Sequence, residues 1–258
     1  MLLHVVADYG TGDLAFAEVH QHLARLLPEA SVVPLSVAPF DTVSAGFCVA
    51  QLALTEGPDD RVVYVNVAPR QDHDAPREEN AGERLAAARL DSGVLVVGVA
   101  SGASLGFLAD EGVVLHAVDV PAHGSQFRSR DVFPEAVAAL ARGHDELLGQ
   151  PLTCNPAPAE CVVYTDGYGN LKTSWHAAPA EPGSRVRVTA GSEAIEAVVT
   201  DGVFTVPAGE VSFAPGSSGW PTADGGFRAF WEVFARGASA AAMLGRPASG
   251  TPVEVTPV

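Results

Sequence analysis

Lysine is almost absent from this chain. Among 258 residues there are 15 Lys and Arg against 31 Asp and Glu, and Lys172 is the only lysine. A lysine Schiff base or a phosphate-binding P-loop lysine therefore has almost nowhere to be placed. The formal net charge of −16 leaves no basic stripe to neutralise phosphates, which argues against nucleic acid as a partner. An acidic surface fits either ordinary solvation or a cationic ligand.

Long apolar runs are missing too. None reaches the ~18–20 residues that a membrane-spanning helix needs, so no membrane partner is expected. The first ten residues lack the basic segment and cleavage site of a signal peptide; they indicate a strand. The three cysteines, Cys48, Cys154 and Cys161, fit no metal or redox spacing. We therefore expect no metal site and a reducing, cytoplasmic location.

The first 150 residues alternate apolar, β-branched runs with segments of helical periodicity. This alternation predicts an α/β N-terminal domain with a layered, mostly parallel sheet. A charged stretch over 68–90 is expected to be an irregular loop. Strands are expected at 2–6, 31–37, 61–67, 93–99 and 113–118, and helices at 14–27, 42–54 and 133–147.

The amino-acid composition and the hydrophobic pattern change after residue 150. Residues 151–160 carry three prolines and predict a stiff linker. Short β-type runs separated by Gly and Pro follow, which favours a small all-β, barrel-like C-terminal domain over 161–258. A helix is expected only within 227–244. The expected strands of this domain are 161–165, 184–189, 194–200, 203–206 and 251–255.

Two patches carry the chemistry that a small ligand needs. Asp8 ends the first expected strand, where a carboxylate in an α/β sheet can accept two ribose hydroxyls. Asp166, Tyr168 and Asn170 offer a carboxylate, an aromatic face and a carboxamide within five residues, which suits an ammonium and an adenine ring. For both patches the alternative is structural: a turn aspartate bonding its own backbone, and a hairpin turn.

Four motifs occur together in one order along nearly the whole chain. They are Ala7-Asp8-Tyr9-Gly10, Phe127-Arg128-Ser129-Arg130-Asp131-Val132-Phe133, Asp166-Gly167-Tyr168-Gly169-Asn170 and Gly216-Ser217-Ser218-Gly219. With these motifs the sequence resembles the S-adenosylmethionine hydroxide adenosyltransferases, whose relatives include the fluorinase and chlorinase enzymes. The Asp166 motif is the most specific of the four.

The resemblance implies an α/β domain joined to a β-barrel and a homotrimer whose sites lie between neighbouring subunits. It implies no cofactor, since S-adenosylmethionine is the substrate. Asp8 would hold the ribose hydroxyls and Phe40 would pack on the nucleoside, unless Phe40 is a core aromatic. Asp166 and Ser217 would bind the methionine end, although Ser217 also fits a plain turn serine. Tyr168 and Asn170 would meet the adenine.

The residues that the family uses around the attacking water are altered. Ala68 stands at the family's aspartate, Arg128 at its histidine, and Val99-Ala100-Ser101-Gly102 replaces a Pro-Asp-Asn-Gly-like turn. The loop over 70–77 could rebuild the water site, with His73 as base, Asp72 or Asp74 orienting it, and Arg77 as a further catalytic candidate. A solvated charged loop is the simpler interpretation, and a metal on Asp72-His73-Asp74 is weaker still.

Three functions follow from the resemblance. The first is attack of water at the ribose C5′ of S-adenosylmethionine, giving adenosine and methionine, with Arg77, Arg128 and Ser129 as catalytic candidates. The second is a catalytically inactive nucleoside-binding protein on the same scaffold. The third is a halogenase, because Ser129 stands where the family has glycine and its hydroxyl can donate to a halide.

Overall fold

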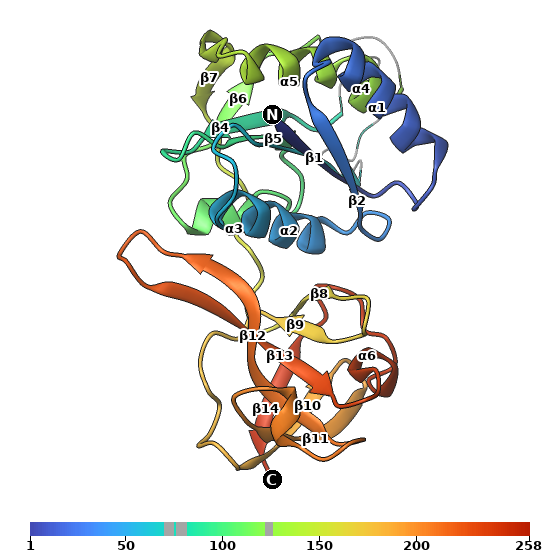
Figure 1. Cartoon of the computed structure of the whole chain (residues 1–258), viewed down its shortest axis with the longest axis vertical. Helices are drawn as coiled ribbons and strands as arrows, with labels where there is room; N and C mark the ends of the chain where they lie inside the picture. Colours follow the sequence, from blue (N-terminus) through green and yellow to red (C-terminus); the bar gives the residue numbers. More distant parts are fainter. Residues whose placement is uncertain (70–74, 76–81, 122–125) are drawn as a thin grey trace. The chain divides into compact units, whose positions relative to one another are not determined.

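The computed structural model describes residues 1–69, 75, 82–121 and 126–258. The chain divides into two compact units, Met1–Ala157 and Pro158–Val258. Each unit contains a seven-stranded sheet, as Figure 1 shows. The break at Ala157 falls inside the proline-rich segment 151–160. In the described ranges, no helix is long and apolar enough to cross a membrane.

The sheet of the first unit has the strand order β2-β1-β3-β5-β4-β6-β7. Helices α1, α4 and α5 lie on one side of it and α2 and α3 on the other (Figure 1). The elements are β1 (Leu2–Ala7), α1 (Leu14–Leu26), β2 (Ser31–Ser36), α2 (Thr42–Leu54), β3 (Val62–Asn66), β4 (Leu85–Arg89), β5 (Leu95–Val99), α3 (Gly106–Asp110), β6 (His116–Val118), α4 (Arg128–Asp131), α5 (Phe133–Ala141), the short 3-10 turn η1 (Asp145–Leu147) and β7 (Leu148–Pro151).

This first sheet is mixed, whereas the sequence predicts a mostly parallel one. Strands β2, β1, β3 and β5 pair in parallel, but β4 pairs antiparallel with both β5 and β6, and β6 with β7. Strand β4 lies inside the stretch predicted as an irregular loop, so that prediction is wrong for Leu85–Arg89. Its Leu-Ala-Ala-Ala-Arg sequence has weak intrinsic strand preference; burial of its first four residues between β5 and β6 holds it in the sheet.

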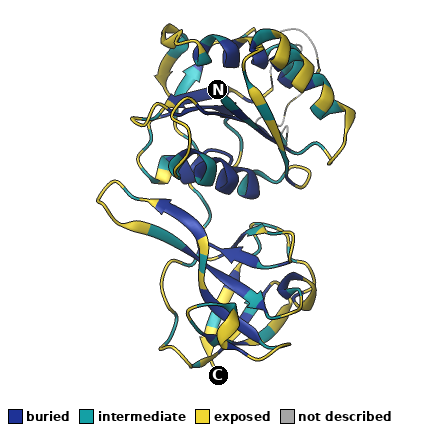
Figure 2. Cartoon of the chain, in the orientation of Figure 1, coloured by how far each residue is buried: buried dark blue, intermediate teal, exposed yellow. Residues whose placement is uncertain are grey.

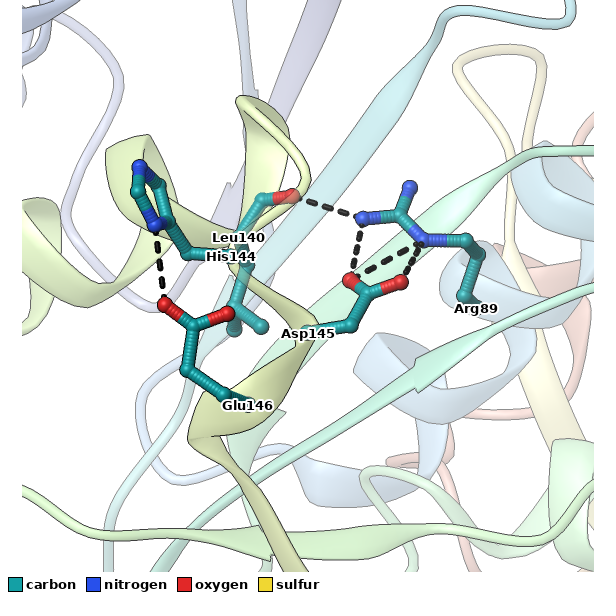
Figure 3. Close-up of polar contacts among 5 residues, drawn as sticks. All are labelled: Arg89, Leu140, His144, Asp145 and Glu146. Carbon is teal, nitrogen blue, oxygen red and sulfur yellow. Dashed lines mark hydrogen bonds and ion pairs between the residues drawn. The ribbon is translucent and has the colours of Figure 1, made fainter.

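Arg89 fastens β4 to the segment that follows α5. Its guanidinium donates two hydrogen bonds to the Asp145 carboxylate, from Nη2 to Oδ1 at 2.7 Å and from Nε to Oδ2 at 3.0 Å. The same Nη2 also donates to the Leu140 carbonyl at 2.7 Å (Figure 3). The Arg89 hydrogen bonds lower the pKa of Asp145 below its usual range. Beside it, His144 Nδ1 and Glu146 Oε1 lie 2.9 Å apart, and because both side chains are exposed this pair contributes little to stability. The arginine thus satisfies a carbonyl at the C-terminal end of α5.

The core of the first unit is built from the apolar faces of β1, β3, β4 and β5 against α1 and α5. Leu3, Leu23, Tyr64 and Leu140 are fully buried. Figure 2 shows this buried layer running along the central strands. All five residues of β3 and of β5 are buried, which explains why these strands appear in the sequence as continuous apolar runs.

The sheet of the second unit has the order β14-β10-β11-β12-β13-β9-β8. It curls, because Cys161, which leads into β8, forms a bridge with Pro252, which leads into β14. Its pairings are antiparallel except for β11–β12. The elements are β8 (Val162–Thr165), β9 (Leu171–Thr173), β10 (Arg185–Ala190), β11 (Glu193–Val199), the 3-10 turn η2 (Val203–Thr205), β12 (Val211–Pro221), β13 (Phe227–Ala235), α6 (Ala240–Met243) and β14 (Val253–Pro257).

Two expectations for this unit are wrong, and a third is met only by a short element. Residues 203–206 do not form a strand; Val203–Thr205 is a 3-10 turn. The helix expected within 227–244 is present but short, since only Ala240–Met243 is helical, and the first half of this range is strand β13, whose Trp231 and Val233 pack in one core with Phe213. The Gly216–Gly219 motif is no separate turn, because it forms an irregularity in the register inside β12.

Candidate functional site

A cavity of about 210 Å³ opens at the carboxyl ends of three parallel strands in the first unit. Asp8 follows β1, Asn66 ends β3 and Val99 ends β5. Parallel strands deliver their carboxyl ends to one edge of the sheet, where open α/β folds bind ligands. The lining residues are Asp8, Tyr9, Phe40, Asn66, Ala68, Gly82, Glu83, Val99, Gln126, Phe127, Arg128, Ser129 and Phe133.

Asp8 and Phe40 are joined on this edge. The Phe40 N–H donates to Asp8 Oδ2 at 2.9 Å. Phe40 has a φ of 62°, in the left-handed region that non-glycine residues seldom adopt, and the residue is 61% exposed. The alternative that Phe40 is a core aromatic is therefore wrong. A strained, exposed aromatic held at a cavity by a carboxylate is typical of a ligand-binding position.

Behind the cavity, hydroxyl and amide groups form a chain of hydrogen bonds. Tyr9 Oη and Ser129 Oγ are 2.5 Å apart, Asn66 Nδ2 donates to Tyr9 Oη at 3.1 Å, and Tyr64 Oη donates to the Ser129 carbonyl at 3.1 Å. Burial, helped by the charge of Asp8, raises the pKa of Tyr9 to about 12. The phenol is therefore a hydrogen-bonding group at neutral pH, unsuited to act as a base.

This network predicts an alkaline loss of stability. A tyrosine whose folded pKa is raised stabilises the fold below its unfolded pKa of about 10, and this contribution disappears as pH rises through the folded value of about 12. We expect the stability gap between the wild type and Tyr9→Phe to narrow by about 2–3 kcal/mol across that range. The single lysine keeps the background titration small. Denaturation followed by circular dichroism measures the gap; one that stays constant with pH would contradict the burial of Tyr9.

Arg128 is the cationic group of the cavity. Its guanidinium lies 4.8 Å from the Phe133 ring centroid, and Nη2 donates to the Pro121 carbonyl at 3.1 Å. Its Nε is buried without a hydrogen-bond partner in the described part of the chain. Burial lowers the pKa of Arg128, and the nearby Glu83 charge partly opposes this shift. A buried donor without a partner suits an oxygen of a ligand or of water.

Tyr9, Asn66 and Glu83 are polar residues of this cavity to which the sequence analysis gave no role. Tyr9 lies within a motif but its hydroxyl carries no signal, and Asn66 is the one polar residue at the end of a buried run. Glu83 comes from the stretch expected to be a loop, only 5% of it is exposed, and it has no signal in the sequence. Chain order alone does not place Glu83 beside Ala68; the insertion of β4 into the sheet does.

In the second unit, Asp166 organises its own turn. Its Oδ1 accepts the Tyr168 and Asn170 N–H groups, each at 2.9 Å, and its Oδ2 accepts Asn170 Nδ2 at 2.9 Å. Both oxygens therefore have structural partners, as the turn alternative expects. Tyr168 presents an 83% exposed ring at the tip of the same turn.

Gly169 provides a sharp test of this turn. Its φ is 83°, and a Cβ there would lie 2.0 Å from Oγ of Ser239, the residue that caps α6. We expect Gly169→Ala to lower the free energy of unfolding by about 3 kcal/mol, from left-handed strain plus overpacking. Gly167→Ala is the matched control, because nothing lies within 4 Å of its Cβ position. Tryptophan fluorescence during denaturation measures both; equal effects would show that the turn tolerates side chains.

A buried ion pair lies near the Asp166 turn. Lys172 Nζ donates to Glu232 Oε1 at 2.6 Å, with side chains 11% and 2% exposed. Burial raises the pKa of Glu232, while Lys172 and the Ser218 N–H act in the opposite direction. Ser218 is buried, whereas Ser217 beside it is exposed. The single lysine of the chain is thus committed to the second unit's interior.

The structure brings the predicted residues together in two groups. Asp8, Phe40, Arg128 and Ser129 line the cavity of the first unit. Asp166, Tyr168 and Asn170 share one turn in the second unit, and Ser217 lies on β12. Arg77, His73, Asp72 and Asp74 lie outside the described residues. Among the residues that are described, no group of His, Cys, Asp and Glu side chains is arranged to hold a metal ion.

Comparison with known proteins supports the fold and gives no activity. No family model and no curated protein matches the chain. A crystal structure of an uncharacterized conserved protein from Thermotoga maritima is similar, with a TM-score of 0.77 and 20% identity over 98% of this chain and 99% of that one. A conserved hypothetical protein from Thermus thermophilus gives a TM-score of 0.67 and 25% identity over 99% of both chains.

Proposed function

We propose that the cavity of the first unit binds the adenosyl group of S-adenosylmethionine and that the protein cleaves this compound with water, giving adenosine and methionine. One observation carries the proposal. Four residues assigned to this site from three separate stretches of the sequence, Asp8, Phe40 and the pair Arg128 and Ser129, line a single cavity at the carboxyl ends of parallel strands. Residues 120 positions apart, Tyr9 and Ser129, are hydrogen-bonded there.

Each side chain has a role in holding the nucleoside. Asp8 Oδ2 holds the Phe40 backbone, and the ribose hydroxyls would donate to this carboxylate chiefly through Oδ1. The exposed Phe40 ring provides an apolar face for the nucleoside. Arg128 and Ser129 lie together on the α4 segment of the same cavity, where they can surround the nucleophile.

The reaction is a direct substitution. The oxygen of water forms a bond to C5′ while the C5′–S bond breaks, and the bonding electron pair leaves on sulfur as the sulfonium becomes a neutral thioether. The water loses one proton. The cavity has to hold the oxygen about 3–3.5 Å from C5′ and in line with sulfur, and burial of Arg128 and Phe133 partly removes competing solvent.

A second candidate is nucleoside binding without turnover. Ala68 lines the cavity where the resembling family has its aspartate, so a carboxylate is missing at that position. The halogenase alternative depends on Ser129, whose hydroxyl already shares a hydrogen bond with Tyr9. A halide would therefore have to compete with the phenol for that donor.

One assay separates the three. Purified protein is incubated with S-adenosylmethionine, alone and with chloride or fluoride, and the products are separated by chromatography. Water attack gives adenosine and methionine in every sample, whereas a halogenase gives a 5′-halo nucleoside only with its halide. Measurable adenosine binding with no product in any sample would replace the cleavage proposal with the binding one.

The remaining part of the proposal comes from the resemblance. It is a homotrimer in which Asp166, Tyr168, Asn170 and Ser217 serve a neighbouring subunit's ligand. The layered α/β first domain and barrel-like second domain are expected from the sequence pattern as well, and the reducing cytoplasmic setting is expected from the cysteines. Because Asp166 uses both oxygens within its own turn, the turn's exposed tip would make that contact. Sedimentation equilibrium measures the mass in solution, and a monomeric mass would contradict the proposed homotrimer.

A further inference from the structure

Glu83 is a buried carboxylate in the cavity where the water nucleophile would be held. Only 5% of this residue is exposed. It lines the 210 Å³ cavity together with Ala68, Arg128 and Ser129. Burying a carboxylate costs free energy that interactions in its surroundings offset. As a residue of the cavity wall, Glu83 can add a contact with a ligand or water to the interactions it already makes. The position is also unusual in sequence, because Glu83 closely precedes β4, the strand that inserts antiparallel between β5 and β6.

Glu83 and Arg128 are electrically coupled. The charge of Glu83 acts to raise the pKa of Arg128 against the lowering caused by burial. Arg128 Nη1 also approaches the Glu83 carbonyl at 3.5 Å. Next to them the buried Arg128 Nε lacks a hydrogen-bond partner among the described residues. A water molecule between the two groups would accept from Arg128 and donate to the carboxylate.

The same two residues also line a second cavity. This space, about 360 Å³, shares Gly82, Glu83 and Arg128 with the first and otherwise lies against β4, β6 and the residues after β6. Glu83 and Arg128 therefore lie between the two cavities. Both residues are in reach of water held in the second cavity as well as in the first.

We propose that Glu83 supplies the carboxylate that position 68 lacks, and that it acts with Arg128 to orient and deprotonate the attacking water. This inference rests on the proposed function. As the water oxygen bonds to C5′ and sulfur departs with the C–S electron pair, the proton passes to the Glu83 carboxylate and then to solvent. Arg128 donates a hydrogen bond to the water oxygen and so holds it in place for attack.

The test compares Glu83→Gln and Glu83→Ala with the wild type, using Glu29→Gln on the exposed surface as the control. Adenosine formation from S-adenosylmethionine gives kcat, and calorimetry with adenosine gives Kd. We expect Glu83→Gln to lower kcat at least about 100-fold, the usual range for a lost base, with Kd changed less than about threefold. Formate, a free carboxylate that fits the vacated space, should restore part of the activity of Glu83→Ala.

The other outcomes are distinct. A Glu83→Gln variant that retains activity within about threefold of wild type, or a Glu83→Ala variant that loses binding and activity together without rescue by formate, would overturn the role of Glu83 and leave the proposed function standing. A halo nucleoside as the only product of wild type would overturn it too. A wild type that makes no product with any nucleophile removes the proposed function, and the role of Glu83 with it.

Discussion

Replacing Lys172 with methionine is expected to lower the free energy of unfolding of the second unit by about 3–5 kcal/mol. The substitution leaves the Glu232 carboxylate, 2% exposed, without its cation. Removing one partner of a buried pair costs far more than the pair contributes as a whole, because a buried charge stays uncompensated. The methionine side chain fills nearly the same volume, so loss of packing contributes little.

The double variant Lys172→Met/Glu232→Gln is the control. Glutamine keeps the shape of Glu232 and can still accept the Ser218 N–H, and with no charge left to bury most of the lost stability should return. Glycine at 216 shows how closely this carboxylate is surrounded, since a Cβ there would lie 1.8 Å from Glu232 Oε1. All three tryptophans, Trp175, Trp220 and Trp231, are in the second unit, so their fluorescence reports its unfolding.

The loss of unfolding free energy in Lys172→Met, relative to wild type, should depend on pH in a direction that the pKa of Glu232 determines. Burial raises the pKa of Glu232 in the folded chain and Lys172 lowers it, so the variant raises this pKa further. A raised carboxyl pKa adds stability below the unfolded value of about 4.5 and loses it as pH rises through the folded value. The stability difference between wild type and Lys172→Met should therefore become smaller as the pH is lowered. A difference below about 1 kcal/mol at neutral pH, or a double variant as unstable as the single one, would contradict the account.

Replacing Asp8 with alanine is expected to weaken adenosine binding at least about 100-fold, because two hydrogen bonds to a charged acceptor are lost, each worth about 1.5–3 kcal/mol. Part of the loss is indirect, because Asp8 also holds the Phe40 backbone in its left-handed conformation. Asp8→Asn separates the two contributions. Its amide oxygen still accepts the Phe40 N–H, but the charge is gone, so an intermediate loss of about 10-fold is expected.

Asp13→Ala is the matched control for Asp8. It lies in the same turn and its carboxylate caps α1 by accepting the Ala15 N–H, but it does not line the 210 Å³ cavity. The variant should lose about 1 kcal/mol of stability and no affinity. Calorimetry with adenosine measures all three. An Asp8→Ala variant that binds like wild type would show that the ribose role is wrong.

The first elements of the fold could be predicted from the sequence for clear reasons. Leu2–Ala7 and Leu14–Leu26 have strong periodicity and end at a Gly-rich turn and before Pro28. Strand β4 could not be predicted, because alanines carry little β-preference and their burial comes from neighbours far along the chain. Strand β13 was obscured by the alanine-rich residues that follow it.

The candidate site divides in the same way. Asp8 and Ser129 were singled out from the sequence, Asp8 by its place after a strand and Ser129 by its motif, and both line the candidate cavity. Glu83 was missed, since only the long-range pairing of β4 with β5 and β6 brings it to the cavity. For Asp166 the motif located the turn, whereas the hydrogen bonds show that its carboxylate organises the backbone. Local sequence identifies chemistry-bearing residues, but side-chain partners depend on the assembled fold.

The most direct test of the central claim is cleavage of S-adenosylmethionine in water enriched in the oxygen-18 isotope (the heavy oxygen), with the products analysed by mass spectrometry. Attack of water at C5′ predicts that adenosine carries the heavy oxygen in its 5′-hydroxyl group and that methionine is released unlabelled in equal amount. Adenosine without the label, heavy oxygen in methionine, or no adenosine at all from a protein that binds the nucleoside would contradict the account.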